Sequence, residues 1–165
     1  MIIPIKQILL EAQIHINDLD KKVGRQQSNK ILSDLHHQKF GSPLKNDMIN
    51  DWRNNSDIVF NYFNKNPNNI NGFIRTKVLP NNDENSKYFH ALKTLTKRNP
   101  KAITFISDLA STEKGAGKEL LNSLPNNKPK VLRAWNKDLV DYYKSHGYTQ
   151  LIHPELRGKL NMYKI

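Results

Sequence analysis

Residues 102–121 have the sequence AITFISDLASTEKGAGKELL, and the fold prediction depends on this stretch. Its first five residues form a nearly continuous apolar run, which is typical of an interior strand buried on both faces. A loop with Gly115 and Gly117 follows, and the chain then enters a segment of good helix formers. Such a loop directs free backbone N–H groups and the positive end of a helix dipole toward one point, where a phosphate can bind.

Two glycines one residue apart are weak evidence by themselves, because turns throughout proteins use glycine for positive φ. A purely structural turn therefore explains the loop as well as a phosphate site does. A dinucleotide-binding loop requires a third glycine and a later acidic residue, and a P-loop requires Gly-Lys-Ser/Thr after four spacers. The sequence has neither pattern.

A second informative segment begins at Asn136, directly after a strand predicted over residues 131–135. The following helix, predicted over residues 137–146, carries Tyr143 seven residues after Asn136 and ends at Gly147 and Tyr148. Asn136 is a good helix N-cap, Gly147 suits the left-handed residue that follows a helix, and tyrosines pack well. Each position has a structural explanation, but their joint occurrence with the glycine loop is more specific than either segment alone.

At these residues, over roughly 103–150, the sequence resembles the GNAT superfamily of acyl-CoA-dependent N-acyltransferases. The pyrophosphate loop of that family has the form Gln/Arg-x-x-Gly-x-Gly/Ala. Gly115 and Gly117 match its glycines, whereas Thr112 stands where Gln or Arg is usual.

The next segment of the family commonly has the form Asn-x-x-Ala-x-x-Leu-Tyr-x-x-x-Gly-Phe. Four residues of this chain fall in register with it, and two replace the family's Ala and Leu. The matches are Asn136, Tyr143, Gly147 and Tyr148, and the replacements are Leu139 and Tyr142.

The resemblance implies a binding site for acetyl-CoA. Backbone amides from Glu113 to Lys118 would hold the pyrophosphate, and the backbone of Leu109 and Ala110 would pair with the pantetheine arm like an extra strand. Lys114 and Lys118 would add positive charge. The implied cofactor contacts are Leu109, Ala110, Glu113, Lys114, Gly115, Ala116, Gly117, Lys118, Asn136 and Tyr143.

The resemblance also implies catalytic roles. Tyr143 matches a family tyrosine that lies near the CoA sulfur, so its phenol is the predicted acid for the departing thiolate. Asp108 is the candidate base because it ends the buried strand beside the expected slot. A structural role for Asp108, capping loop amides, is an equally good explanation, and water chains can replace a single base.

The fold class implied is α/β (α+β), with a mixed, mostly antiparallel central sheet flanked by helices. A parallel pair of central strands is expected to splay after Asp108 and near Trp135.

Upstream, apolar residues recur at helical spacings from residue 4 to 37. This pattern predicts a helical N-terminal elaboration over residues 1–57, interrupted at Gly24 and residues 25–30. Strands are predicted at 58–63, 72–79, 148–152 and 161–165, and a helix at 87–98. A length of 165 residues favours a single domain over 1–165.

Composition narrows the functional classes. The chain has no cysteine, which excludes disulfides, thiolate catalysis and thiolate-ligated zinc. Its histidines show no metal-ligand spacing, so we expect no metal. We find no secretory signal and no apolar run long enough to span a bilayer, so we expect a cytoplasmic protein without a membrane partner.

The chain carries 26 Lys and Arg against 15 Asp and Glu, for a formal net charge of +11. This excess indicates an anionic partner, although a solvated basic surface also explains it. We therefore predict an N-acetyltransferase whose acceptor amine belongs to a protein, a small molecule or an aminoacyl-tRNA, the last or an acidic protein suiting the charge. The alternatives are a basic nucleic-acid-binding module and a catalytically inactive protein with a GNAT-like fold.

Overall fold

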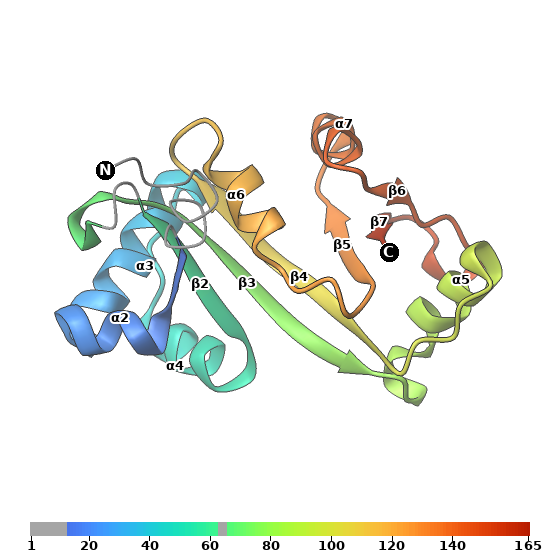
Figure 1. Ribbon diagram of the computed structural model, residues 1–165, viewed down its shortest axis with the longest axis horizontal. Coiled ribbons are helices and arrows are strands. Elements are labelled where there is room, and N and C mark those ends of the chain that lie inside the picture. The colour runs from blue at the N-terminus through green and yellow to red at the C-terminus, as the bar shows by residue number, and fades with distance from the viewer. Residues whose placement is uncertain (1–12, 63–65) are drawn as a thin grey trace, which may run out of the picture. The chain divides into compact units, whose positions relative to one another are not determined.

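The computed structural model describes residues 13–62 and 66–165 (Figure 1). Its strands form a seven-stranded sheet in the order β1-β2-β3-β4-β5-β7-β6. The β4–β5 pair is parallel, whereas the ladders β1–β2, β2–β3, β5–β7 and β6–β7 are antiparallel. The strands are β1 (Gln13–His15), β2 (Asp57–Tyr62), β3 (Ile70–Pro80), β4 (Ala102–Ser111), β5 (Lys130–Ala134), β6 (Thr149–Gln150) and β7 (Leu160–Lys164). The predicted mixed, mostly antiparallel sheet is confirmed.

Six α-helices and three short 3-10 turns connect the strands in the described part of the chain. The helices are α2 (Ile16–Val23), α3 (Arg25–Phe40), α4 (Asn46–Asn55), α5 (Ser86–Thr96), α6 (Ala116–Asn122) and α7 (Lys137–Ser145). The turns are η2 (Pro67–Asn69), η3 (Asp83–Asn85) and η4 (Pro154–Leu156).

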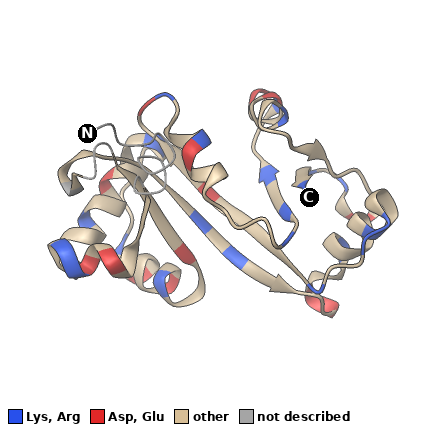
Figure 2. Ribbon diagram, viewed as in Figure 1, with Lys and Arg blue, Asp and Glu red and all other residues tan. Residues whose placement is uncertain are grey.

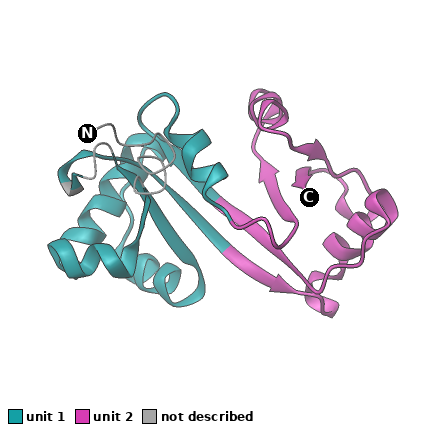
Figure 3. Ribbon diagram, in the orientation of Figure 1, with its two compact units in different colours: residues 1–76, 108–124 teal, residues 77–107, 125–165 magenta. Residues whose placement is uncertain are grey.

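The chain divides into two compact units (Figure 3). Unit 1 consists of Met1–Thr76 and Asp108–Leu124, and unit 2 consists of Lys77–Ser107 and Pro125–Ile165. β3 and β4 each contribute residues to both units.

The core of unit 1 lies between the β1–β2–β3 ladder and its helices. Ile14 lies opposite Phe60, and Phe60 lies opposite Phe73, so the three side chains share one face of the ladder. All three are buried, and the ring centroids of Phe60 and Phe73 are 6.5 Å apart. Residues of α2, α3 and α4 complete this cluster, among them Leu19, Leu32 and Trp52.

The core of unit 2 lies between α5 and one face of its strands. Phe105 is opposite Val131, and Val131 is opposite Tyr163, so these side chains share a face. They pack with Tyr88 and Leu92 of α5. The helix that the apolar spacing predicts over residues 87–98 is thus present, one residue longer at its start and two shorter at its end.

The predicted helical N-terminus differs from the structure at residues 13–15, which form β1. Ile14 in this strand and Ile16 in the following helix both belong to the core of unit 1, so one apolar pattern runs through two kinds of element. Helical spacing alone therefore did not reveal the strand. The earlier part of that pattern, residues 4–12, lies outside the described residues.

Gly24 interrupts the N-terminal helices as predicted. It has a φ of 87°, and its N–H donates to the carbonyl of Asp20 at 2.8 Å, which ends α2. The polar residues 25–30, predicted as part of the break, instead form the first turns of α3. Ser28 within this segment is buried, and both its backbone N–H and its hydroxyl donate to the Gly24 carbonyl, at 3.0 and 3.1 Å.

Candidate functional site

The loop between β4 and α6 has the local geometry that its glycines predict. Gly115 has a φ of 93°, a conformation that residues with a side chain rarely adopt, and it immediately precedes α6. Within the described residues, no hydrogen bond engages the backbone N–H groups of Glu113, Lys114, Gly115, Gly117 or Lys118. The N–H of Ala116 donates to the Glu113 carbonyl at 3.3 Å. The loop therefore presents a group of free donors, as an anion-binding turn requires.

The start of this loop is fixed to β3 through Asn71. The Asn71 carbonyl accepts from both the backbone N–H and the hydroxyl of Thr112, at 2.8 and 3.1 Å. The Ser111 hydroxyl donates to the Glu113 carbonyl at 2.7 Å. Thr112, which stands where the family has Gln or Arg, thus uses both of its donors to anchor the loop.

A chain of side-chain amides supports the same anchor from within the sheet. Gln13 donates to Asn61, Asn61 donates to Asn71, and the Asn71 amide donates to the Glu113 carboxylate, at 2.8, 2.8 and 3.3 Å. Asn61 and Asn71 are 2% and 7% exposed. Buried amides are costly unless their hydrogen bonds are made, so this chain favours one position of the loop.

Gly72 allows β3 to approach the end of β4. A Cβ atom at this position would lie 2.7 Å from the Ala110 carbonyl oxygen and 3.2 Å from Leu120 of α6. A contact of 2.7 Å with backbone is prohibitive, so a side chain here would displace the strand that leads into the loop. The sequence analysis assigned no role to Gly72.

Lys114 and Lys118, the predicted cationic residues of the loop, are both exposed. Neither makes an ion pair with a described residue. The negative charge of Glu113 is engaged by Asn71, while its backbone N–H belongs to the free group of donors. The loop therefore combines free N–H groups with two unpaired ammonium groups.

Asp108, the candidate base, forms an ion pair with Arg75 of β3. Arg75 Nε donates to Asp108 Oδ2 at 2.6 Å, and both side chains are largely buried. The Arg75 guanidinium also lies over the Trp52 ring, 4.1 Å from its centroid. Asp108 thus has a structural partner other than the loop amides that the sequence suggested, and its role as a base stays a prediction.

In unit 2, the segment from Asn136 to Tyr148 folds as its residues predict. The Asn136 side chain accepts from the Leu139 N–H at 2.9 Å and caps α7. Gly147 follows the helix with a φ of 87°, and the Tyr148 N–H donates back to the Tyr143 carbonyl at 3.1 Å. The cap and the turn fix both ends of the helix that carries Tyr143.

Tyr143 lies in an aromatic cluster. Its ring centroid is 5.2 Å from that of Tyr142 and 5.7 Å from that of Tyr148, both in edge-on geometry. Burial raises the pKa of Tyr142, and burial with a smaller effect of Tyr143 raises the pKa of Tyr148. The Tyr148 hydroxyl is buried and has no hydrogen-bond partner among the described residues. Tyr142 and Tyr148 are therefore held in their protonated, neutral form.

The predicted site residues thus fall into two groups. Asp108, Leu109, Ala110 and the 113–118 loop belong to unit 1, whereas Asn136 and Tyr143 belong to unit 2. The β4–β5 ladder covers residues 104–106 of β4, so Leu109 and Ala110 lie beyond it. The predicted splay of the two strands stays a prediction.

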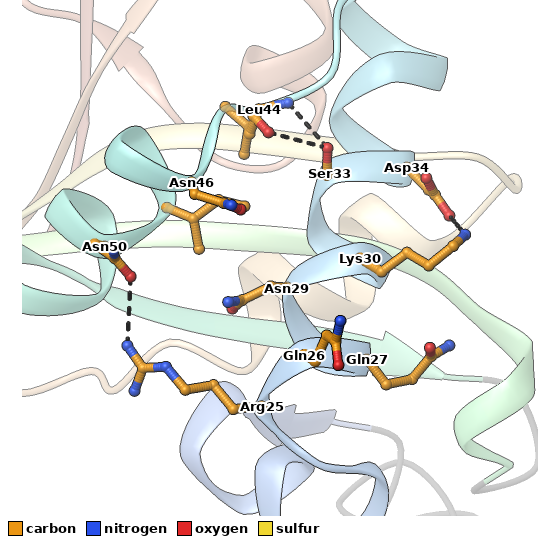
Figure 4. A pocket seen from close by; sticks show the side chains of 11 residues that line it. Arg25, Gln26, Gln27, Asn29, Lys30, Ser33, Asp34, Leu44, Asn46 and Asn50 are labelled. Atoms are coloured by element: carbon orange, nitrogen blue, oxygen red, sulfur yellow. Dashed lines mark hydrogen bonds and ion pairs between the residues drawn. The ribbon is translucent and has the colours of Figure 1, made fainter.

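A polar pocket of unit 1 lies between α3 and α4 (Figure 4). Amide side chains dominate its lining, and its charged groups make contacts inside it. Lys30 pairs with Asp34 at 2.7 Å, and Arg25 donates to Asn50 at 3.5 Å. The pocket contains none of the predicted site residues, so we do not assign the reaction to it.

Two other kinds of site lack support in the described parts of the chain. Residues 13–62 and 66–165 contain no group of three or more His, Asp or Glu side chains that could hold a metal ion. None of the helices described is both long and apolar enough to cross a membrane.

The comparisons with known proteins identify the fold. By sequence, no family model and no curated protein matches the chain. Among solved structures, NAA60 of Arabidopsis thaliana in complex with acetyl-CoA superposes with a TM-score of 0.52 at 16% identity, covering 82% of this chain and 90% of that chain. The same protein with a bisubstrate analogue gives 0.52 at 17% identity, covering 82% and 88%.

AtaT, in its complex with acetyl-methionyl-tRNAfMet, superposes with a TM-score of 0.45 at 16% identity, covering 72% of this chain and 76% of that chain. The superposition with NAA60 carries the fold assignment, and the mixed, mostly antiparallel sheet with its parallel pair β4–β5 agrees with it. This chain has the fold of the GNAT-superfamily acetyltransferases.

Proposed function

We propose that the chain is an N-acetyltransferase that moves the acetyl group of acetyl-CoA to a primary amine. The observation that carries the proposal is the group of free backbone N–H donors at residues 113–118, at the position where the GNAT fold has its pyrophosphate loop. Lys114 and Lys118 supply positive charge beside these donors. Hydrogen-bond donors together with positive charge suit the two negatively charged phosphate groups of CoA.

The residues present fit the rest of the cosubstrate as well. Leu109 and Ala110 lie in β4 beyond its ladder with β5, so their backbone can pair with the amides of a pantetheine arm as an added strand would. Ala110 is fully buried, and Gly72 keeps β3 close behind it. The end of β4 and the loop therefore form one continuous binding element within unit 1.

In the reaction, the lone pair of the amine attacks the thioester carbonyl carbon, the carbon–sulfur bond breaks, and the sulfur leaves with a proton. Tyr143 is the proposed donor of that proton, because a neutral phenol can protonate a thiolate. The nitrogen loses a second proton as the amide forms, and this proton restores the phenol of Tyr143. The incoming ammonium must first lose a proton. Asp108 is the proposed acceptor through Oδ1, since Oδ2 is engaged by Arg75. The acceptor amine itself is that of a protein, a small molecule or an aminoacyl-tRNA.

The test is a thermal titration with acetyl-CoA. A ligand at 100 times its Kd adds about 2.7 kcal/mol of stability, which raises the melting temperature by several degrees. We expect Gly117→Asp and Lys114→Glu to remove this rise, because each places a carboxylate at the phosphate position. Asn54→Asp, which adds the same single negative charge as Gly117→Asp at an exposed position of α4, should keep it. An equal rise in all four proteins would contradict the site.

Turnover can be followed with a thiol reagent without background, because the chain has no cysteine and every thiol detected is CoA. We expect CoA release that requires both acetyl-CoA and an amine. A protein that binds acetyl-CoA through residues 113–118 and releases no CoA with any class of amine would be the inactive alternative.

A further inference from the structure

Trp135 is exposed in a way that folding does not explain. The chain has two tryptophans: Trp52 is 8% exposed in the core of unit 1, whereas Trp135 is 83% exposed at the end of β5. Exposing a tryptophan side chain to water costs more free energy than exposing almost any other side chain. A highly exposed tryptophan is therefore a marker of a binding surface.

Trp135 lines a groove of about 760 Å³ that lies wholly within unit 2. Tyr88 and Phe105 contribute apolar side chains to its lining, and Arg133 and Lys159 contribute positive charge. Arg133 is the penultimate residue of β5, and Trp135 is the first residue after that strand. The groove therefore joins an exposed aromatic face to two cations.

The two cations have no charged partner of their own. Within the described residues, neither Arg133 nor Lys159 makes an ion pair or a side-chain hydrogen bond, and both are exposed. In unit 1, by contrast, the buried arginines are paired with carboxylates. The charges in the groove are thus available to an external anion.

Asn161 adds an unsatisfied polar group next to the groove. It is 2% exposed, it lies opposite Arg133 in the β5–β7 ladder, and neither atom of its amide has a hydrogen-bond partner among the described residues. It lines a second cavity of about 380 Å³, which shares Gly158 and Lys159 with the groove. A buried amide without partners costs free energy, so it points to a ligand that would use it.

Positive charge is not confined to the groove but is spread over the whole of unit 2. Unit 2 holds 14 Lys and Arg against 5 Asp and Glu, a net +9, so it carries most of the +11 of the chain (Figure 2). Residues 85–107 contain five of these cations and no acid. Lys93, Lys97, Arg98 and Lys101 within this segment are all exposed.

We propose that this groove binds single-stranded nucleic acid, with a base stacked on Trp135, phosphates at Arg133 and Lys159, and the Asn161 amide, at the adjoining cavity, facing the edge of a base. Aromatic platforms joined to cationic grooves bind single strands in this way, and amide side chains form paired hydrogen bonds with base edges. An acidic peptide would use the cations but would leave the tryptophan face and the amide without a role. This inference rests on the proposed function and names its acceptor as an amine carried by a single-stranded nucleic acid.

The test measures the affinity for an unstructured RNA 12-mer and for a DNA 12-mer of the same sequence by fluorescence anisotropy. We expect Trp135→Ala to weaken binding by about 5- to 150-fold, the effect of one lost stacking contact. Arg133→Ala and Lys159→Ala should each lower the slope of log affinity against log salt by about 1. Lys39→Ala, an exposed cation of unit 1, should change neither quantity by more than about twofold.

Trp135 is exposed, so its replacement does not disturb the core, and the emission of the buried Trp52 verifies folding in each variant. Binding by Trp135→Ala with wild-type affinity would overturn the proposal. So would a polyglutamate peptide that displaces the RNA equally well from wild type and from Trp135→Ala.

The Gly117→Asp variant separates this inference from the proposed function. We expect it to lose acetyl-CoA binding and to bind the 12-mers normally. If the wild-type protein binds nucleic acid through Trp135 but never binds acetyl-CoA, the groove stands and the transferase proposal fails. If it binds acetyl-CoA and no 12-mer at low salt, the groove proposal fails and the transferase proposal stands.

Discussion

The two units of the molecule differ in how they use charge. Unit 1 holds 12 Lys and Arg against 10 Asp and Glu, a net +2, and its buried cations are paired. Unit 2 has a net +9, and most of its cations are exposed without carboxylate partners. The fold needs only the paired charges of unit 1. The unpaired charges of unit 2 form no ion pairs within the described residues, so they are available to an anionic partner.

A similar difference separates the proposed binding elements. The loop at residues 113–118 uses backbone donors that a network of amides holds in place, which suits a ligand of fixed shape such as a diphosphate. The groove at Trp135 uses exposed side chains, which suit a flexible polyanion. Substitutions in the two units can test whether charge in unit 1 is structural and whether the chemistry in unit 2 depends on particular side chains.

The largest expected effect is on the buried ion pair of unit 1. Arg53 donates to both oxygens of Asp20, at 2.7 and 2.8 Å, and to Asn29 at 2.8 Å, while its side chain is only 4% exposed. We expect Arg53→Met to lower the free energy of unfolding by about 3–5 kcal/mol, because Asp20 is left without its partner. Lys93→Met on exposed α5 should change it by less than about 0.5 kcal/mol. Urea unfolding measures the free energy of unfolding of both variants. Equal losses of stability would contradict the view that charge is structural in unit 1 and not in unit 2.

The second effect concerns the two neighbouring tyrosines of unit 2. We expect Tyr143→Phe to lower kcat by about 10²-fold while acetyl-CoA binding is kept, because the proton donor for the thiolate is lost. Tyr148→Phe removes a hydroxyl that is buried and has no partner among the described residues, so kcat should not change and the melting temperature should hold or rise. A Tyr143→Phe protein with normal kcat, or equal losses in both variants, would refute the acid assignment.

The smallest effect is a pH dependence within unit 1. The hydrogen bond from Arg53 lowers the pKa of Asp20 below its ordinary value, against the opposing effect of burial. The unfolded chain therefore binds this proton at a higher pH than the folded chain does. The contribution of Asp20 to stability is complete above pH of about 4 and is lost as the pH falls through the lowered pKa.

Urea unfolding of the wild type and of Asp20→Asn at several pH values measures this contribution. We expect the stability difference between the two proteins to be constant from pH 7 to about 5 and to shrink below about 4. A difference that does not change with pH would mean that the ion pair contributes nothing through the charge of Asp20.

Features set by neighbouring residues could be predicted from the sequence. The Asn136 cap depends on a residue three positions away, and the positive φ of Gly115 and Gly147 follows from glycine at the end of a strand or helix. The strand–loop–helix order at residues 102–122 depends on composition and periodicity alone. These local signals were sufficient for the position of the proposed diphosphate loop, whereas the mostly antiparallel sheet was predicted from the resemblance to the GNAT superfamily.

Features that depend on strand register could not be predicted. Arg75 meets Asp108 across 33 residues, and Asn61, Asn71 and Glu113 come together from two strands and a loop. Gly72 has a role only because β3 passes close to Ala110. Trp135 directly follows β5, and nothing in its neighbouring residues predicts that its side chain is 83% exposed.

The most direct test of the central claim is an amide NMR titration of the ¹⁵N-labelled protein with CoA. The account predicts the largest shifts at Lys114, Gly115, Gly117 and Lys118, whose N–H groups are free in the structure, and no shift at Gly24 or Gly41. CoA that leaves the amides of residues 113–118 unchanged, or that shifts only residues of unit 2, would contradict the account.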